Sequence, residues 1–192
     1  MRFIINSLPI GIISDIHNEI GKLKSIFAAN EEIKQWYCLG DIVDFLEPEG
    51  NREMMDFWIE NCLNVPCLMG NHEEIVSHDL LNISFTHQMA IRKFYTSFEF
   101  LLPNKETLYA FHNKPKCNWS FINEGNYSYR QFIDDFTNIW TGARAVLIGH
   151  NHKQFVMDFE NMEECPQIWS VGAVKLGRYA IIDKDGLQLK RL

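Results

Sequence analysis

The hydrophobic pattern in the first half of the chain alternates between two periods. Apolar runs of strand length cover residues 10–14, 36–39 and 65–69. Between and after these runs, apolar positions recur at the spacing of one helix face: Ile20, Leu23 and Phe27; Met55, Trp58, Ile59 and Cys62; Ile91, Phe94, Tyr95 and Phe98. Asn51, shortly before the second group, is a candidate N-cap. This β-α-β-α-β order predicts parallel strands covered by helices.

The second half of the chain has shorter segments and ends differently. Two further strands and one helix face are expected: residues 108–111 and 145–148, with Tyr129, Phe132, Ile133 and Phe136 between them. Asp185 and Gly186 suit a tight turn between residues 179–182 and 187–189, which predicts a terminal hairpin. The pattern therefore indicates an α/β fold with mixed sheets. No Pro- or Ser-rich linker interrupts it, so a single domain over residues 1–192 is expected.

Composition and charge restrict the function. The 192 residues have a formal net charge of -7, which argues against extended nucleic-acid binding, because such binding needs many Lys and Arg side chains. No window reaches the roughly 18 apolar residues of a membrane span. The five cysteines are an odd number without a CxxC pair, which is typical of reduced thiols. A soluble, cytoplasmic protein with no membrane association is expected.

Polar side chains follow five of the apolar runs, at the point where each expected strand ends. These motifs are Asp15-Ile16-His17, Gly40-Asp41-Ile42-Val43-Asp44, Gly70-Asn71-His72-Glu73, His112, and Gly149-His150-Asn151-His152. Ligands of open α/β sheets bind beyond the carboxyl ends of the strands, so the five motifs can meet at one rim. Taken singly, each is weak evidence, because Asp-x-His also suits a turn and a lone histidine also suits a core.

Taken together, the motifs offer the donors of a metal site. Asp, Asn and His side chains suit Mn, Fe or Zn, and the absence of Cys from the set argues against a structural zinc site. Five of the seven histidines belong to the set. The other two, His78 and His87, are expected in solvent or on a helix surface.

The series Asp-x-His, Gly-Asp-x-x-Asp, Gly-Asn-His-Glu, His and Gly-His-x-His resembles the motifs of the calcineurin-like metallophosphoesterase superfamily. The motifs span residues 15–152, most of the chain, and are specific as a set. The resemblance implies a ββ sandwich of mixed sheets flanked by helices, in four αββα layers. It also implies phosphoester hydrolysis through two divalent metal ions, with Mn first and Fe or Zn as alternatives, and a bridging hydroxide.

The resemblance also assigns roles by position. One metal would be held by Asp15, His17, Asp41 and His152, and the second by Asn71, His112 and His150, with Asp41 bridging both. His72 corresponds to the family's catalytic histidine, which stabilises the transition state or protonates the leaving oxygen. Asp44 corresponds to its carboxylate partner, which orients the imidazole and favours its protonated form. The alternative role for Asp44 is a helix cap.

Departures from the family motifs bear on the substrate. Members that dephosphorylate proteins have Arg where this chain has Phe45 and Met69, which argues against a phosphoprotein substrate. Many relatives have Gly at the position of Asn18, and many small bacterial relatives have Gly-Ser-Pro in place of residues 113–115. Three basic side chains are candidate phosphate contacts or, more simply, exposed solubilising charges: Lys114, Lys116 and Arg130.

The function expected from the sequence is hydrolysis of a small phosphomonoester or phosphodiester, with nucleotides among the candidates. A nuclease of the same superfamily is one alternative, which the acidic charge and the lack of a second domain disfavour. A non-catalytic interaction module is another, because some proteins of this fold have lost metal ligands. All the expected ligands are present in this chain.

Overall fold

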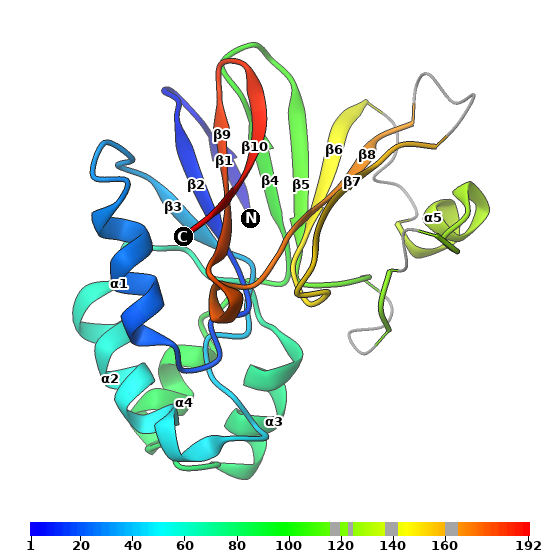
Figure 1. The fold of residues 1–192 in the computed structure, drawn as a ribbon. Coiled ribbons are helices and arrows are strands. Elements are labelled where there is room, and N and C mark those ends of the chain that lie inside the picture. Colours follow the sequence, from blue (N-terminus) through cyan, green and yellow to red (C-terminus); the bar gives the residue numbers. More distant parts are fainter. Residues whose placement is uncertain (116–119, 123–124, 137–141, 160–164) are drawn as a thin grey trace.

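Two β-sheets form the centre of the computed structural model, which describes residues 1–115, 120–122, 125–136, 142–159 and 165–192 (Figure 1). The four-stranded sheet has the order β10-β9-β2-β3, from Ile10–Ile13 (β2), Trp36–Cys38 (β3), Arg178–Asp183 (β9) and Gly186–Arg191 (β10). The six-stranded sheet has the order β1-β4-β5-β6-β8-β7, from Arg2–Ile4 (β1), Phe98–Leu101 (β4), Thr107–Phe111 (β5), Ala143–Ile148 (β6), Gln154–Met157 (β7) and Gln167–Val171 (β8). Both sheets contain parallel and antiparallel pairs.

The two sheets pack face to face because alternate side chains of a strand point to opposite sides. In β2, Ile12 packs in the core between the sheets, whereas Ile13 belongs to the core under the helices. In β6, Ala145 and Leu147 face the other sheet and Val146 faces away from it. There is one core between the sheets and one on the outer side of each sheet, so strands such as β2 are buried on both faces and read as continuous apolar runs in the sequence.

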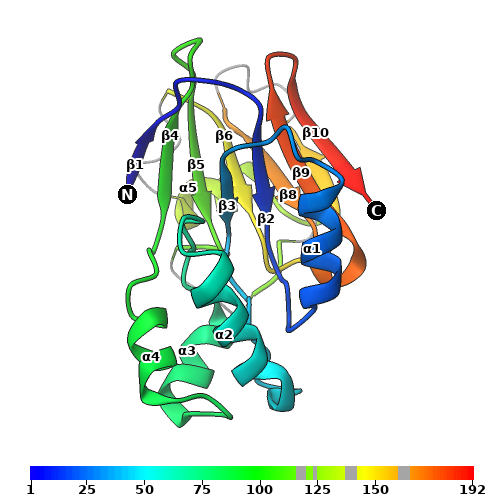
Figure 2. The same ribbon diagram turned by 90° about the vertical axis from the view of Figure 1, so that its left-hand side faces the viewer.

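Helices cover both outer faces of the sandwich. On the side of the four-stranded sheet lie Ile20–Ala28 (α1), Asn51–Asn61 (α2), Asn71–Asp79 (α3) and Phe85–Ile91 (α4), which reach past the carboxyl ends of β2 and β3 (Figures 1 and 2). On the other side lies Tyr129–Asp135 (α5), packed on β6, β7 and β8. The described part of the chain also contains the 3-10 turns Pro48–Gly50 and Val174–Leu176. The mixed-sheet sandwich flanked by helices is therefore confirmed.

The terminal hairpin and the helix of the second half are confirmed as well. β9 and β10 pair antiparallel, and Gly186 pairs with Asp183 next to the tight turn. α5 buries Phe132 and starts after Ser128, whose side chain accepts a hydrogen bond from the Gln131 backbone N–H. These elements are local, so their sequence patterns were sufficient to predict them.

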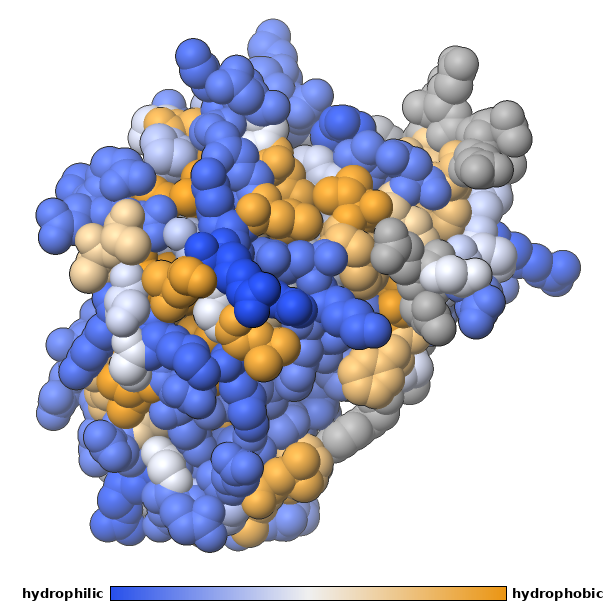
Figure 3. All heavy atoms as spheres, in the orientation of Figure 1, coloured by the Kyte–Doolittle hydropathy of each residue, from blue (hydrophilic) through white to orange (hydrophobic). Residues whose placement is uncertain are grey.

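The surface and the thiols agree with the composition. On the face shown in Figure 3, apolar side chains lie in separate groups among hydrophilic ones. Within the described part of the chain, no helix is long and apolar enough to cross a membrane. Four cysteines are free thiols: Cys38, Cys62, Cys67 and Cys165. Cys117 lies outside the described residues.

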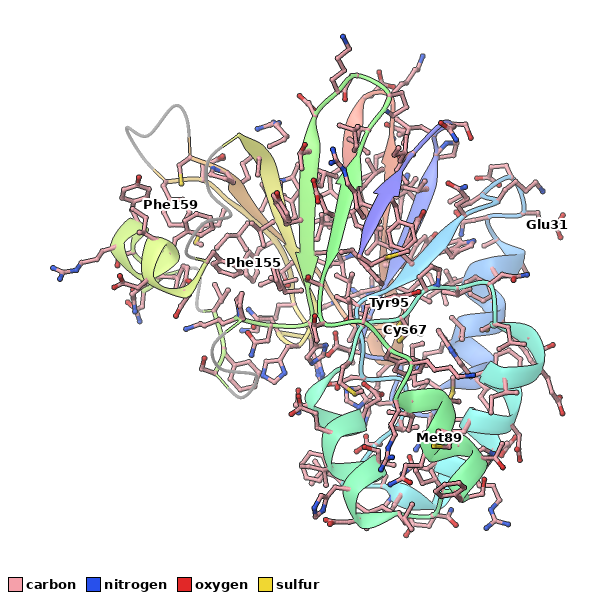
Figure 4. The ribbon with its side chains drawn as sticks, turned by 180° about the vertical axis from the view of Figure 1, so that it is seen from behind. Glu31, Cys67, Met89, Tyr95, Phe155 and Phe159 are labelled. Atoms are coloured by element: carbon pink, nitrogen blue, oxygen red, sulfur yellow. The ribbon has the colours of Figure 1, made fainter. Side chains whose placement is uncertain are left out.

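The prediction of a strand over residues 65–69 is wrong. Only isolated bridges form there, between Cys38 and Cys67 and between Leu68 and Tyr95. Figure 4 shows Cys67 and Tyr95 close together at the junction between the sheets and the helices. Leu68 is fully buried, so the apolar character of this run reflects packing rather than membership of a sheet.

The helix expected across residues 91–98 is also wrong. α4 ends at Ile91, and Phe98 is the first residue of β4, where it pairs with Ala110. Phe98 is fully buried between the sheets, with its ring centroid 5.7 Å from that of Phe100. Long-range pairing therefore decided the structure of a segment whose local spacing fits a helix.

Candidate metal centre

The polar motifs meet where the strands of the two sheets end. β2 runs parallel to β3, and β5 runs parallel to β6, so the loops that follow each pair lie side by side. Backbone hydrogen bonds tie these loops together: Asp15 N–H donates to Gly40 O at 2.9 Å, and Gly149 N–H donates to His112 O at 3.0 Å. Residues that are far apart in the sequence are thereby held at one rim.

Strained backbone is concentrated at this rim. Six of its residues have φ between 47° and 65°: Asp15, His17, Asn18, Asp41, His150 and His152. Each such conformation costs roughly 1–3 kcal/mol for a residue with a side chain and persists only where the surroundings impose it. Here they do, since Ile16 N–H donates to Asp41 O at 2.7 Å and Lys175 N–H donates to Asp15 O at 3.1 Å. Clusters of this kind are typical of functional sites.

Three of the predicted ligands form a first group. The Nε2 atoms of His17 and His152 lie 3.0 Å apart, and Asp15 Oδ1 lies 3.9 Å and 3.2 Å from them. Asp15 Oδ2 accepts the backbone N–H of His150 at 2.9 Å, which turns Oδ1 toward the imidazoles. His152 is the exposed member, with 41% of its side-chain surface accessible, so the group opens to solvent on its side.

The other four predicted ligands form a second group. Asn71 Oδ1 lies 2.9 Å from His112 Nε2 and 2.8 Å from His150 Nδ1, and Asp41 Oδ2 lies 3.2 Å from His112 Nε2. His112 Nδ1 donates to Leu39 O at 2.7 Å, which leaves Nε2 as the nitrogen that can bind a cation. Asp41 lies between the groups, because its carboxylate is within 4.8 Å of donor atoms of His17 as well as of His112 and His150.

The donor atoms of both groups fit divalent cations. They are carboxylate and amide oxygens with imidazole nitrogens, the set that suits Mn, Fe or Zn. Asp15 Oδ1 is buried and faces the imidazole nitrogens of His152 and His17, at 3.2 Å and 3.9 Å, and a buried carboxylate oxygen needs a positive or hydrogen-bonding partner. A cation between Asp15, His17 and His152 would satisfy that oxygen and separate the two facing nitrogens.

Protonation of the second group shows where positive charge is favoured. Burial disfavours the imidazolium of His112, but the Asp41 carboxylate outweighs it and raises the pKa of His112 to about 10. Burial likewise opposes ionisation of Asp41, and the charge of His112 holds the pKa of Asp41 well below its usual value. Burial and the charge of His112 lower the pKa of His150 to about 4. Without a metal ion, a proton on His112 therefore balances the negative charge of Asp41. A bound cation would compete with this proton for His112 Nε2.

His72 lies beside Asp41 and Asp44. Its Nε2 is 4.0 Å from Asp41 Oδ2, and its Nδ1 is 3.3 Å from Asp44 Oδ1 and accepts Phe45 N–H at 3.2 Å. Burial lowers the pKa of His72, whereas the carboxylates of Asp41 and Asp44 oppose this. The Asp44 carboxylate thus favours the protonated ring, as expected, but burial has the larger effect on the pKa of His72. His17, Asp41 and His72 also form a possible metal-binding group.

Asp44 has more partners than the sequence indicated. Its Oδ2 lies 3.3 Å from His17 Nδ1 and 3.5 Å from Lys175 Nζ. Burial opposes its ionisation, but the contact with His17 holds the pKa of Asp44 below its usual value. Its Oδ1 accepts the N–H of Leu46 at 2.8 Å, so it also stabilises a turn. Nothing in the motifs pointed to Lys175, which comes from a distant segment and reaches the site only through the fold.

Asn51, which the sequence suggested as the N-cap of a helix, has a different role in the structure. α2 starts at Asn51 itself, after Gly50, and the Asn51 side chain does not cap it. Instead, its buried amide accepts Asp44 N–H at 2.8 Å and Asn18 Nδ2–H at 3.0 Å. Asn51 therefore supports the Asp44 loop.

The profile of the calcineurin-like phosphoesterase family matches residues 8–171, most of the chain, which agrees with the resemblance of the motifs. The chain belongs to this family. A comparison of this family member with curated proteins finds no match. Members of the family are generally metal-dependent phosphoesterases, and the two groups described above lie where its motifs meet.

Solved structures of several phosphoesterases share the fold of this chain. A metallophosphoesterase from Sphaerobacter thermophilus has a TM-score of 0.69 and 19% identity, over 97% of this chain and 89% of that one. A candidate diadenosine tetraphosphatase has a TM-score of 0.62 and 13% identity, over 100% and 96% of the two chains. The phosphoesterase Yfce from E. coli has a TM-score of 0.55 and 18% identity, over 96% and 93%. Identities this low show a common fold only.

Glu73, in the third motif of this calcineurin-like chain, organises the loop that carries Asp41. The carboxylate is fully buried and accepts four backbone N–H groups, those of Asp41 (2.8 Å), Ile42 (2.7 Å), Val43 (3.2 Å) and Gly70 (2.9 Å). Burial and the nearby charge of Asp41 raise the pKa of Glu73 to about 7. The sequence assigned no role to this residue. It lies three residues after Gly70, in the first turn of α3, where a Glu side chain can accept the backbone N–H of the residue that precedes the helix.

Glu73→Gln should destabilise the protein by about 3 kcal/mol, because an amide cannot accept all four N–H groups with the strength of a carboxylate. Urea unfolding of the metal-free protein would measure this loss. Glu74→Gln is the matched control, since Glu74 is the adjacent but exposed carboxylate. Equal stability of the two variants would contradict the role given to Glu73.

Two glycines of the family motifs have no room for a side chain. A Cβ on Gly70 would overlap Asp41 Oδ1, and a Cβ on Gly149 would overlap Ser14 Oγ and come within 3.0 Å of Asp15 Oδ2. Both contacts involve the loops of the candidate ligands. The glycines therefore allow the loops to approach each other closely enough to form the site.

The basic side chains considered for phosphate contact are placed differently from one another. Lys114 is mostly buried, with Nζ 3.1 Å from Asp135 Oδ2 and 5.1 Å from the ring centroid of Tyr127. The ammonium group of Lys114 is therefore already paired with a carboxylate. Lys114 is neither an exposed solubilising charge nor a cation available to bind phosphate. Arg130 is exposed. Lys116 lies outside the described residues.

Of the two histidines outside the motifs, one was predicted wrongly. His78 is exposed, as expected. His87 is buried instead of solvated: its Nε2 lies 2.8 Å from Asp56 Oδ1, and its Nδ1 accepts Ser84 N–H at 3.3 Å. It thereby joins α4 to α2 and helps to cap α4. Its partner Asp56 is far from it in the sequence, so the local pattern gave no indication of this contact.

Proposed function

We propose that the protein is a metal-dependent phosphoesterase that hydrolyses small phosphomonoesters or phosphodiesters. The observation that supports this best is the convergence of seven donor side chains into two adjacent groups with Asp41 between them. Membership of the calcineurin-like phosphoesterase family supports the same reaction. Residues 1–192 would act as one catalytic domain, and the free thiols fit a cytoplasmic compartment.

Two divalent metal ions would be held by these groups. Asp15, His17, Asp41 and His152 would bind one, and Asp41, Asn71, His112 and His150 would bind the other. When bound, such ions polarise the phosphoryl oxygens and lower the pKa of a bound water molecule. Mn²⁺ is the proposed metal, with Fe or Zn as the alternatives that the same donors would accept.

The remaining side chains orient the ligands and move a proton. Asp44 faces His17 Nδ1 and so holds its Nε2 toward the first group. His72 accepts a hydrogen bond at Nδ1 from Phe45 N–H, so the neutral ring carries its proton on Nε2, on the side of Asp41. From there we propose that His72 donates this proton to the leaving oxygen of the ester.

Several features favour a compact substrate. The arginines of the protein-dephosphorylating relatives are replaced by Phe45 and Met69, and Lys114 is paired with Asp135. The net charge of -7 disfavours a long nucleic acid, whose binding depends on many cationic contacts. The metals would then supply most of the positive charge that meets the phosphate, and nucleotides are suitable candidates.

The test is a side-by-side assay of the full chain loaded with Mn²⁺. We expect hydrolysis of p-nitrophenyl phosphate, bis-p-nitrophenyl phosphate or a mononucleotide, and little cleavage of a phosphopeptide or plasmid DNA. Cleavage of DNA without turnover of the small esters would favour a nuclease. Failure to bind any divalent metal, or full metal occupancy without turnover of any ester, would favour a non-catalytic module.

A further inference from the structure

Phe121 is an exposed aromatic side chain directly beside the candidate metal centre. Its ring stacks on that of His150, with centroids 4.8 Å apart and an interplanar angle of 27°. About two thirds of the residue remains accessible, at 66%. Because one face lies on the imidazole, this accessible area belongs mainly to the opposite face and the edges of the ring.

The segment that carries Phe121 is tied to the ligand loops on both sides. Asn151 Nδ2 donates to Ile122 O at 2.5 Å, and Asn151 Oδ1 accepts Ile122 N–H at 3.2 Å. Asn113 Nδ2 donates to Ser120 O at 2.7 Å. Asn151 lies between two of the candidate ligands, and Asn113 follows another, so the position of the Phe121 backbone is coupled to the metal-binding loops.

Packing of the core does not explain the Phe121 ring. The neighbouring Ile122 is buried and belongs to the core under α5, whereas Phe121 does not. A single exposed apolar side chain is ordinary by itself. This one differs because it is stacked on a candidate metal ligand and held by paired amide hydrogen bonds, so its outward face is oriented in advance.

We infer that Phe121 forms a subsite for a planar ring of the substrate, which makes it a specificity-determining residue for nucleotide-type phosphoesters. This inference rests on the proposed phosphoesterase function. An ester bound at the metal centre has its phosphoryl group beside His150, and a base attached through a sugar would reach the free face of the ring. Stacking on an aromatic side chain tolerates any base, because every base has a π-face.

The kinetic test compares substrates that differ only in the base. The Mn²⁺-loaded protein is assayed with adenosine 5′-monophosphate and ribose 5-phosphate, and with the methyl esters of both as diesters. Within each pair the bond that breaks joins phosphorus to the same type of primary alkyl oxygen, so the ratio of kcat/KM isolates the base. We expect a preference of about tenfold for the nucleotide, which Phe121→Ala removes and Phe121→Tyr retains.

Phe85→Ala is the matched control, because Phe85 is another exposed phenylalanine, at 69%, on α4 and outside the site. It should keep the ratio of the unchanged protein. If Phe121→Ala lowers kcat/KM for both members of a pair equally, the ring only supports His150, and the inference is wrong. Absence of a preference in the unchanged protein would overturn it too.

An equilibrium measurement separates this inference from the proposed function. Calorimetry with the Mn²⁺-loaded protein would compare the binding of the phosphonate analogues of adenosine 5′-monophosphate and ribose 5-phosphate, in which carbon replaces the oxygen of the bond that would break. The nucleotide analogue should bind about tenfold more tightly, and Phe121→Ala should remove the difference. If no ester is turned over but this difference is found, the catalytic proposal fails while the subsite stands. Equal affinities would overturn the subsite whether or not catalysis occurs.

Discussion

Asp41→Asn should lower turnover by at least about 10³-fold and reduce the bound metal below two ions per chain. Asp41 lies between the two groups of candidate ligands, so its charge would contribute to both ions. Metal catalysis contributes several kcal/mol to such reactions, and each 1.4 kcal/mol is about tenfold in rate. Elemental analysis of the purified variant and kcat/KM on the best ester would be measured together.

Asparagine is the informative replacement at this position. In the native protein, Asp41 Oδ1 accepts a hydrogen bond from the backbone N–H of His72 at 3.0 Å. The amide oxygen of asparagine can still accept this bond, so the loop should keep its shape. The change therefore removes charge with little loss of volume. Circular dichroism and thermal unfolding of the metal-free variant would confirm that the fold is retained.

Asp56→Asn is the matched control, because Asp56 also pairs with a histidine, His87, but away from the metal centre. It should leave metal content and turnover unchanged. If Asp41→Asn kept two tightly bound metals and more than about a tenth of the activity, the placement of Asp41 between the metals would be wrong.

The ligand positions could be predicted because each belongs to a local pattern. Asp15 and Asp41 directly follow short apolar strands, and parallel strands place such positions at one edge of a sheet. The structure brings all seven candidate ligands together there. That these residues bind metal stays a prediction, because a pattern of residue types does not by itself establish metal binding.

The residues that support the ligands could not be predicted in the same way. The His17–Asp44 contact and the approach of Lys175 join segments that no spacing rule relates. Glu73 acts through backbone N–H groups, which are the same for every sequence. These contacts arise only once the loops are folded against each other.

The two wrong elements have a similar physical origin. The spacing of Ile91 to Phe98 fits a helix, but pairing with a distant strand buries Phe98 between the sheets. The apolar run at residues 65–69 is buried without joining a ladder beyond isolated bridges. Short apolar segments are consistent with more than one structure, and tertiary packing decides among them.

His72→Ala should lower kcat by roughly 10²- to 10⁴-fold, the scale of lost general acid–base catalysis, while the metal content stays near two. The structure places His72 next to Asp41 and against the ring of Phe45, with centroids 4.5 Å apart. Because His17, Asp41 and His72 could also hold a cation, metal analysis decides between two roles. Loss of metal in the variant would make His72 a ligand instead of an acid.

The leaving group shows which step His72 assists. If Nε2 donates a proton to the leaving oxygen, the loss in His72→Ala should be large for an alkyl phosphate. It should be much smaller for p-nitrophenyl phosphate, whose phenolate departs without a proton. An equal loss for both esters would show instead that His72 stabilises charge on the phosphoryl group. His87→Ala removes a buried histidine with a carboxylate partner outside the site, so its folded form should retain kcat on both esters.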